Sequence, residues 1–147
     1  MKQQIDYANT AKGAYSVMME MEKYLKTTHL DPKLLQLVKI RASEINGCGY
    51  CLNMHTQEAR NAGESEQRLY CVSAWRECTF YTEAERAALE LCEHITLIPT
   101  KGVPDALYER VRKSFDEKDY VDLLYAINQI NCWNRLSVAT GTKAVKA

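Results

Sequence analysis

The sequence predicts an all-α fold, and three of its features support this expectation. Only six glycines and three prolines occur in 147 residues, runs of β-branched residues are short, and apolar residues recur mostly three or four positions apart. A chain of this length in which 46% of the residues are hydrophobic is the size of one globular domain and can bury a core. We therefore expect residues 1–147 to form a single-domain helical bundle.

Turn and cap residues divide the chain into helices. Asp31-Pro32 supplies an N-cap and a first-turn proline, and Asn46-Gly47 is a turn signal. Gly63 suits the left-handed position after a helix, and Thr82-Glu83-Ala84-Glu85 has the pattern of a capping box for a helix that Pro99 closes. The expected helices cover residues 7–26, 32–45, 48–62, 66–77, 83–95, 104–114 and 117–139.

The last of these helices carries more apolar residues than one buried face requires, so little polar surface remains to meet water. A domain of this size has few places to hide such a helix, and we expect copies of the chain to associate through it as a homo-oligomer. Asn128, Asn131, Asn134 and Arg135 lie on the same helix and are costly to bury without partners. We expect them to form hydrogen bonds between helices or subunits.

Charge and hydropathy exclude several classes of partner. Nineteen basic and nineteen acidic residues give a formal net charge of zero, so no overall field attracts nucleic acid or anionic lipid. Apolar runs such as residues 95–99 are far shorter than the roughly 18 residues of a membrane span. The first residues lack the apolar stretch and cleavage site of a secretory signal, and we expect a cytoplasmic protein without nucleic-acid or membrane partners.

The residues with the strongest chemical signal are Cys48, Cys51 and His55. At spacings of three and four, all three lie on one face of a helix, within reach of disulfide formation and proton transfer. A helix N-terminus and a nearby histidine can lower a thiol pKa from about 8.5 to roughly 3.5–7.5. The thiolate so formed attacks peroxide oxygen or disulfide sulfur, and the second thiol can then close a disulfide.

Two other interpretations of this cluster stay open. The cysteines can be small core residues and His55 an ordinary hydrogen-bonded histidine. Alternatively, the three side chains can supply three zinc ligands, although no second Cys-X-X-Cys or Cys–His pair offers the fourth. We favour redox chemistry and expect no metal or organic cofactor. The remaining cysteines have no partner at short spacing and are assigned to packing: Cys71, Cys78, Cys92 and Cys132.

The segment Arg41-Ala-Ser-Glu-Ile-Asn-Gly-Cys-Gly-Tyr-Cys51, followed by His55-Thr56 and Ala62-Gly63-Glu64, resembles the core motif of the alkyl hydroperoxidase D-like (AhpD-like) proteins in the carboxymuconolactone decarboxylase family. Residues 126–135 resemble the last helix of that family, and the redox core motif spans about residues 34–63. The resemblance implies an AhpD-like helical fold that assembles into trimers or hexamers. It also implies a thiol peroxidase that acts on a hydroperoxide and is reduced by a thiol or dithiol protein.

The resemblance also implies roles for the site residues. Cys51 would attack the peroxide and become a sulfenic acid, Cys48 would resolve it as a disulfide, and His55 would belong to the proton relay. The family commonly has a relay glutamate where this chain has Gln36, and an amide cannot shuttle a proton as a carboxylate does. Glu44, two turns further along the same helix, is the candidate replacement, with a solvated helix-end residue as the alternative.

A second departure concerns Tyr50, because well-described members of the family have a histidine immediately before the second cysteine. Tyr50 can shield the thiol or donate a hydrogen bond to it. Two other functions stay open beside the peroxidase. One is a carboxymuconolactone decarboxylase-like lyase, whose chemistry needs no cysteine pair, and the other is a non-enzymatic redox-sensing oligomer.

Overall fold

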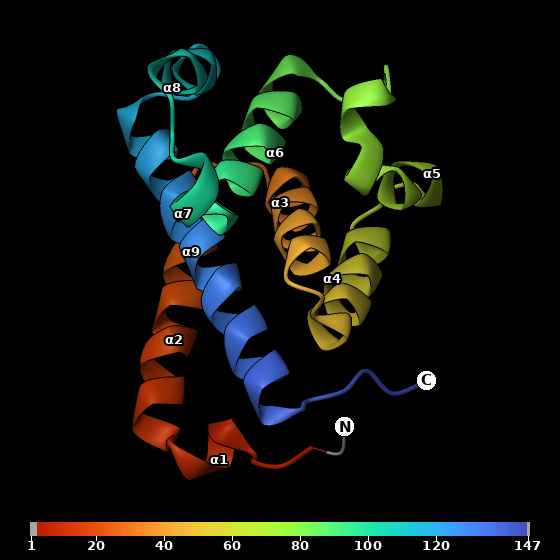
Figure 1. The fold of residues 1–147 in the computed structure, drawn as a ribbon, viewed down its shortest axis with the longest axis vertical. Coiled ribbons are helices and arrows are strands. Elements are labelled where there is room, and N and C mark those ends of the chain that lie inside the picture. The colour runs from red at the N-terminus through yellow and green to blue at the C-terminus, as the bar shows by residue number, and fades with distance from the viewer. Residues whose placement is uncertain (1–2, 147) are drawn as a thin grey trace.

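A computed structural model describes residues 3–146, and within this range the chain forms helices and no strands (Figure 1). The expected all-α fold class is confirmed. The helices are α1 (Tyr7–Thr10), α2 (Lys12–Leu25), α3 (Pro32–Ile45), α4 (Gly49–Asn61), α5 (Glu66–Tyr70), the 3₁₀ helix η1 (Val72–Glu77), α6 (Glu83–Thr96), α7 (Ile98–Lys101), α8 (Asp105–Arg112) and α9 (Glu117–Thr140).

Helix α3 is the centre of the bundle and packs against α4, α6 and α9. Its two apolar faces enter two different clusters of buried side chains. Leu34 and Val38, four residues apart, belong to a cluster with residues of α6, α8 and α9, whereas Leu37 and Ile40 belong to a cluster with η1 and α6. Because both faces are covered, α3 holds the residues at its C-terminal end in fixed positions relative to α9.

The caps expected from the sequence form as predicted. The Asp31 side chain accepts a hydrogen bond from the Lys33 N–H at the start of α3. At the start of α6, Thr82 and Glu85 make both hydrogen bonds of a capping box. These side chains satisfy N–H groups that have no partner within the helix, which fixes where each helix begins.

Two expected helices are divided in the structure. The helix expected over residues 7–26 is interrupted at Ala11, which has φ −122° and ψ 60° and separates α1 from α2. The helix expected over residues 66–77 is α-helical only to Tyr70 and continues as η1, in which Ala74 departs from helical angles. Periodicity alone does not separate these pieces, because apolar spacing is similar in an α-helix and in a short 3₁₀ turn.

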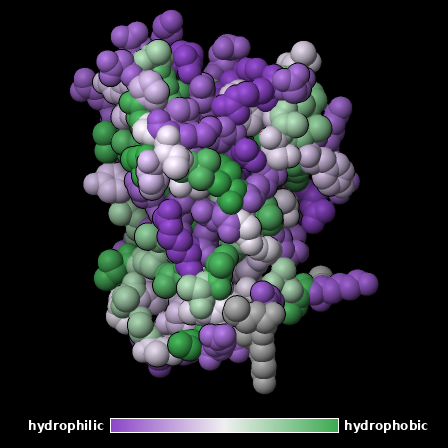
Figure 2. Space-filling model, viewed as in Figure 1, coloured by the Kyte–Doolittle hydropathy of each residue, from purple (hydrophilic) through white to green (hydrophobic). Residues whose placement is uncertain are grey.

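Helix α9 is long and partly buried, as its composition indicates. Leu123, Ile127 and Ile130 are inaccessible to solvent, while Val121 and Tyr125 are exposed on another face. In Figure 2 hydrophilic residues dominate the upper part of the view, and apolar residues are more frequent on the lower left, where α2 lies in Figure 1. Association of copies of the chain through α9 stays a prediction. Among residues 3–146, no helix combines the length and hydropathy needed to cross a membrane.

Candidate functional site

Cys48 and Cys51 lie at the start of α4, directly after a tight turn that ends α3. Gly47 adopts φ +65° in this turn, a left-handed conformation that glycine reaches without steric cost. The turn places Cys48 at the N-cap of α4, where its Sγ accepts a hydrogen bond from the Cys51 N–H at 3.3 Å. Both cysteines are 1% exposed. A cysteine sulfur is therefore the N-cap acceptor of α4, at a position where a Ser, Thr or Asp oxygen usually accepts.

The surroundings of the pair favour a thiolate on Cys48. The pKa of Cys48 is lowered to about 6, mainly by a hydrogen bond from the Cys51 thiol, although burial opposes ionisation. Hydrogen bonds from the Cys51 N–H and from the side chains of Asn134 and Ser137 add to this effect. The same thiol–thiol hydrogen bond, together with burial, raises the pKa of Cys51. These opposite shifts favour Cys48 as the group that carries the charge when the pair loses its first proton, and Cys51 as the group that keeps the second.

Polar side chains of α3 and α9 surround this end of α4. Asn46 donates from its Nδ2 to the side-chain oxygens of Asn131 and Asn134, at 2.9 Å each. Asn134 in turn donates to the Ser43 Oγ at 2.9 Å. The expected hydrogen bonding of Asn131 and Asn134 between helices is confirmed, and Asn134 in addition contacts the cysteine pair.

A cavity of about 790 Å³ opens beside Cys51 between α2, α3, α4 and α9. Cys51 and His55 line it, whereas Cys48 does not. The Cys51 Sγ lies 4.0 Å from the Ser137 Oγ, and the Ser137 Oγ lies 3.5 Å from the Tyr7 hydroxyl. The other lining residues include apolar and aromatic side chains (Tyr15, Met19, Leu25, Leu30, Leu35, Met54 and Trp133) and charged ones (Glu22, Lys26, Asp31, Lys39 and Glu58).

His55 is buried, and its Nδ1 is engaged by two side chains. The Gln36 Oε1 and the Glu58 Oε2 each lie 3.1 Å from this nitrogen. The Gln36 Nε2 also donates to the same Glu58 oxygen, at 3.1 Å. The hydrogen bond with His55 lowers the pKa of the Glu58 carboxyl group. Gln36 thus contacts the histidine directly, and the carboxylate of Glu58 on α4 contacts both of them.

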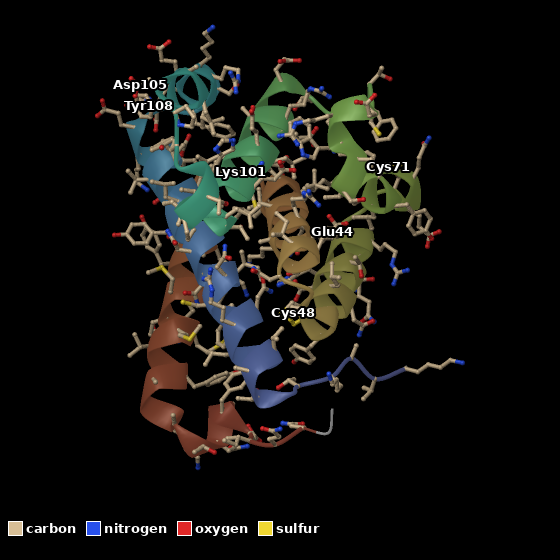
Figure 3. All side chains as sticks on the ribbon, in the orientation of Figure 1. Glu44, Cys48, Cys71, Lys101, Asp105 and Tyr108 are labelled. Carbon is tan, nitrogen blue, oxygen red and sulfur yellow. The ribbon has the colours of Figure 1, made fainter. Side chains whose placement is uncertain are left out.

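Glu44 faces a different environment. Its carboxylate accepts from Arg41 at 2.9 Å, and it is not among the residues that line the cavity. Burial raises its pKa, with Arg41 opposing. Arg41 also binds Glu93, which accepts from Trp75 and Arg76 as well, so Glu44 belongs to an ion-pair cluster between α3, α6 and η1. Figure 3 labels Glu44 and Cys48 at separate places in the bundle.

The structure therefore brings together three of the four residues proposed from the sequence. Cys48 and Cys51 touch, and His55 lies on the same cavity wall as Cys51, whereas the role of Glu44 stays a prediction. Sequence analysis missed Tyr7, Ser137 and Glu58. Only Glu58 gave a usable signal, since it lies three residues after His55 on one helix. Among residues 3–146, no cluster of three or more Cys, His, Asp or Glu side chains has the arrangement of a metal site.

Comparison with known proteins identifies the family. A sequence profile of the carboxymuconolactone decarboxylase family matches residues 13–94. The chain belongs to this family. Its relatives include the uncharacterized protein YdfG of Bacillus subtilis (strain 168), which is 54% identical over 98% of both chains.

Solved structures of the family show the same fold. ATU0492 of Agrobacterium tumefaciens, a protein of unknown function proposed to be the antioxidant defence protein AhpD, is 38% identical. Its structure matches with a TM-score of 0.94 over 99% of this chain and all of the other. An AhpD-core, peroxidase-related protein of Ralstonia eutropha JMP134 matches with a TM-score of 0.83 over 95% of this chain and 74% of the other, at 17% identity. The expected AhpD-like architecture is thereby confirmed.

Proposed function

We propose that the protein is a thiol-dependent peroxidase that reduces a hydroperoxide through Cys51 and Cys48, with His55 as the base. The observation that carries this proposal is the arrangement at the start of α4. The Cys48 sulfur caps α4 by accepting from the Cys51 N–H, and its surroundings lower its pKa. Cys51, one turn later, lines a cavity together with the imidazole of His55. The antioxidant role proposed for the 38% identical relative supports the same class of reaction.

The first step takes place at Cys51, because this sulfur and not Cys48 is reached from the cavity. His55 accepts the thiol proton as the Cys51 sulfur attacks the peroxide oxygen, so that no second free thiolate forms beside Cys48. The O–O bond breaks as the S–O bond forms, and the alkoxide that leaves takes the proton back as an alcohol. The sulfur is oxidised to a sulfenic acid and the peroxide bond is reduced by two electrons.

The second step uses the charge on Cys48. Its thiolate attacks the Cys51 sulfenic acid, the S–S bond forms, and hydroxide leaves and is protonated to water. An external dithiol, or two thiols, then returns two electrons and two protons. One proton stays on Cys51, and the other is released to solvent and balances the proton that the hydroxide took up. The low pKa of Cys48 suits this role, because the resolving sulfur is already ionised at neutral pH.

The cavity favours a hydroperoxide that carries an apolar organic group. Its walls are largely apolar, and the ring centroids of Tyr15 and Trp133 lie 5.7 Å apart in an edge-to-face arrangement. The hydroxyl groups of Tyr7 and Ser137 beside Cys51 can hold the peroxide oxygens by hydrogen bonds. The cavity thus offers hydroxyl groups next to Cys51 and apolar surface for the rest of the substrate, together with charged side chains such as Glu22, Lys26 and Lys39.

Cys51→Ser tests the proposal. We expect this variant to lose hydroperoxide consumption, measured with tert-butyl hydroperoxide and a dithiol reductant. The matched control is Cys132→Ser, which removes an exposed cysteine outside the cavity and should keep wild-type turnover. In Cys48→Ser, a single exposure to hydroperoxide should leave Cys51 as a sulfenic acid that dimedone captures, located by peptide mass spectrometry. Full activity of Cys51→Ser, or capture at other cysteines only, contradicts the proposal.

A further inference from the structure

The contacts of His55 determine which of its ring nitrogens carries a proton. Within residues 3–146, the hydrogen bonds of the ring are made at Nδ1, to the Gln36 Oε1 and the Glu58 Oε2. A carboxylate oxygen only accepts hydrogen bonds. The neighbouring amide group must therefore be oriented before the tautomer can be assigned.

Glu58 provides that orientation. The Gln36 Nε2 donates to the Glu58 Oε2 at 3.1 Å, so the amide turns its oxygen and not its nitrogen toward His55. Two acceptors then face Nδ1, which must be the donor. The Nε2 atom of neutral His55 is left with a free lone pair, as a base requires.

We propose that Glu58 is a positioning residue for His55: together with Gln36 it holds the Nδ1–H tautomer, and its charge stabilises the imidazolium formed when Nε2 takes the Cys51 proton. This inference rests on the proposed function for its catalytic consequence. A carboxylate oriented on Nδ1 has the same relation to the histidine as the acid in acid–histidine–nucleophile triads. Here the Glu58 carboxylate accepts a hydrogen bond from the His55 ring and also orients the Gln36 amide, whose oxygen faces the same Nδ1 atom.

Burial and charge at the two ends of the contact fit this role. The His55 side chain is 5% exposed, and that of Glu58 is 50% exposed. The carboxylate can therefore stay ionised in contact with water while its oxygen reaches the buried ring. Lys39 adds positive charge nearby and contributes to the lowered pKa of Glu58. A half-exposed carboxylate is partly screened and does not itself transfer the proton, so its effect on the rate is expected below the roughly 100-fold minimum of proton-transfer groups.

The experiment moves the carboxylate from one helix to another. Glu58→Gln removes the charge and keeps the size of the side chain. The double variant Glu58→Gln with Gln36→Glu returns a carboxylate to the same ring nitrogen, but from α3. Glu20→Gln, which loses an exposed carboxylate paired with Lys23, is the matched control. The readout is the second-order rate constant for Cys51 oxidation by tert-butyl hydroperoxide, with circular dichroism to confirm folding.

We expect Glu58→Gln to react about tenfold more slowly, the double variant to recover most of the loss, and Glu20→Gln to match the wild type. A purely structural role of Glu58 in α4 would not be restored by a residue on α3. A wild-type rate in Glu58→Gln, or a folded double variant that stays slow, overturns the inference.

A measurement that does not depend on turnover separates the inference from the proposed function. Nitrogen-15 NMR of the histidine ring in the wild-type protein, at about pH 9 where an ordinary imidazole is neutral, reports which nitrogen is protonated. We expect Nδ1–H in the wild type, and a mixture of tautomers in the variant with both Gln36→Leu and Glu58→Leu. An Nε2–H ring in the wild type refutes the positioning role. Absence of hydroperoxide turnover with an Nδ1–H ring refutes the peroxidase assignment while leaving the tautomer assignment intact.

Discussion

The ionisation of Cys48 gives a quantitative prediction for the reduced protein. Its pKa is lowered to about 6, with the hydrogen bond from the Cys51 thiol as the largest cause. A thiol with a pKa of about 6 is roughly 90% ionised at pH 7, compared with about 3% for an unperturbed thiol with a pKa near 8.5. Because a thiol gains its charge on losing a proton, the thiolate form should disappear as the pH falls through about 6.

Cys51→Ala removes the largest contribution while leaving the backbone N–H that caps the helix. A hydrogen bond to a charged group contributes about 1.5–3 kcal/mol, which corresponds to about 1–2 pKa units. We therefore expect the Cys48 pKa to rise to roughly 7–8 in this variant. At pH 7 its thiolate fraction should fall to about one half or less.

The assay is a pH titration of the carbon-13 Cβ signal of Cys48 in protein labelled at cysteine, because this signal reports ionisation without requiring reagent access to a buried sulfur. Cys92→Ala serves as the control, since Cys92 is buried elsewhere and its pKa is raised to about 12 by desolvation. A wild-type Cys48 that titrates near 8.5, or a Cys51→Ala protein that still titrates near 6, would refute the reasoning.

Two further predictions concern the ion-pair cluster between α3, α6 and η1. Glu93→Ala should lower the free energy of unfolding by about 3–5 kcal/mol in urea titrations, because it leaves the half-buried guanidinium of Arg41 without its most buried partner; a loss below 1 kcal/mol would contradict this. Glu44→Gln should leave the rate of hydroperoxide reduction and its pH profile unchanged, because Glu44 contacts Arg41 and does not line the cavity. A changed profile in stopped-flow assays would instead support the sequence-based hypothesis that Glu44 replaces the missing relay carboxylate.

Local signals in the sequence were sufficient to predict where most of the helices begin and end. Asp31-Pro32 and the Thr82–Glu85 box act within one turn of the chain, and α3 and α6 begin where these residues predict. Helical spacing likewise places Cys51 and His55 on one face, at the same cavity, whereas Cys48 at the N-cap of α4 lies outside it. By contrast, no local signal in the sequence marks the break at Ala11, and the contact of Tyr7 in α1 with Ser137 joins residues that are 130 positions apart.

The surroundings of the cysteine pair required the tertiary structure. Asn134 and Ser137 are more than 80 positions away from Cys51, and no pattern in the sequence relates them to it. Family resemblance directed attention to a carboxylate on the helix that contains Gln36 and Glu44. The structure instead shows the carboxylate of Glu58 against His55, from the helix that carries the cysteines themselves. Glu58 therefore reaches the His55 Nδ1 from a helix on which the resemblance does not indicate a carboxylate.

Using a sulfur atom to begin α4 ties the secondary structure to the oxidation state. The Cys48 sulfur accepts the hydrogen bond from the Cys51 N–H. The same sulfur forms the covalent bond to the Cys51 sulfur in the proposed cycle. Each oxidation would remove the negative charge of the Cys48 sulfur, which caps the first turn of this helix, and each reduction would restore that charge. A reductant protein could therefore distinguish the spent form from the ready form by the local order of a single helical turn, without any rearrangement of the bundle.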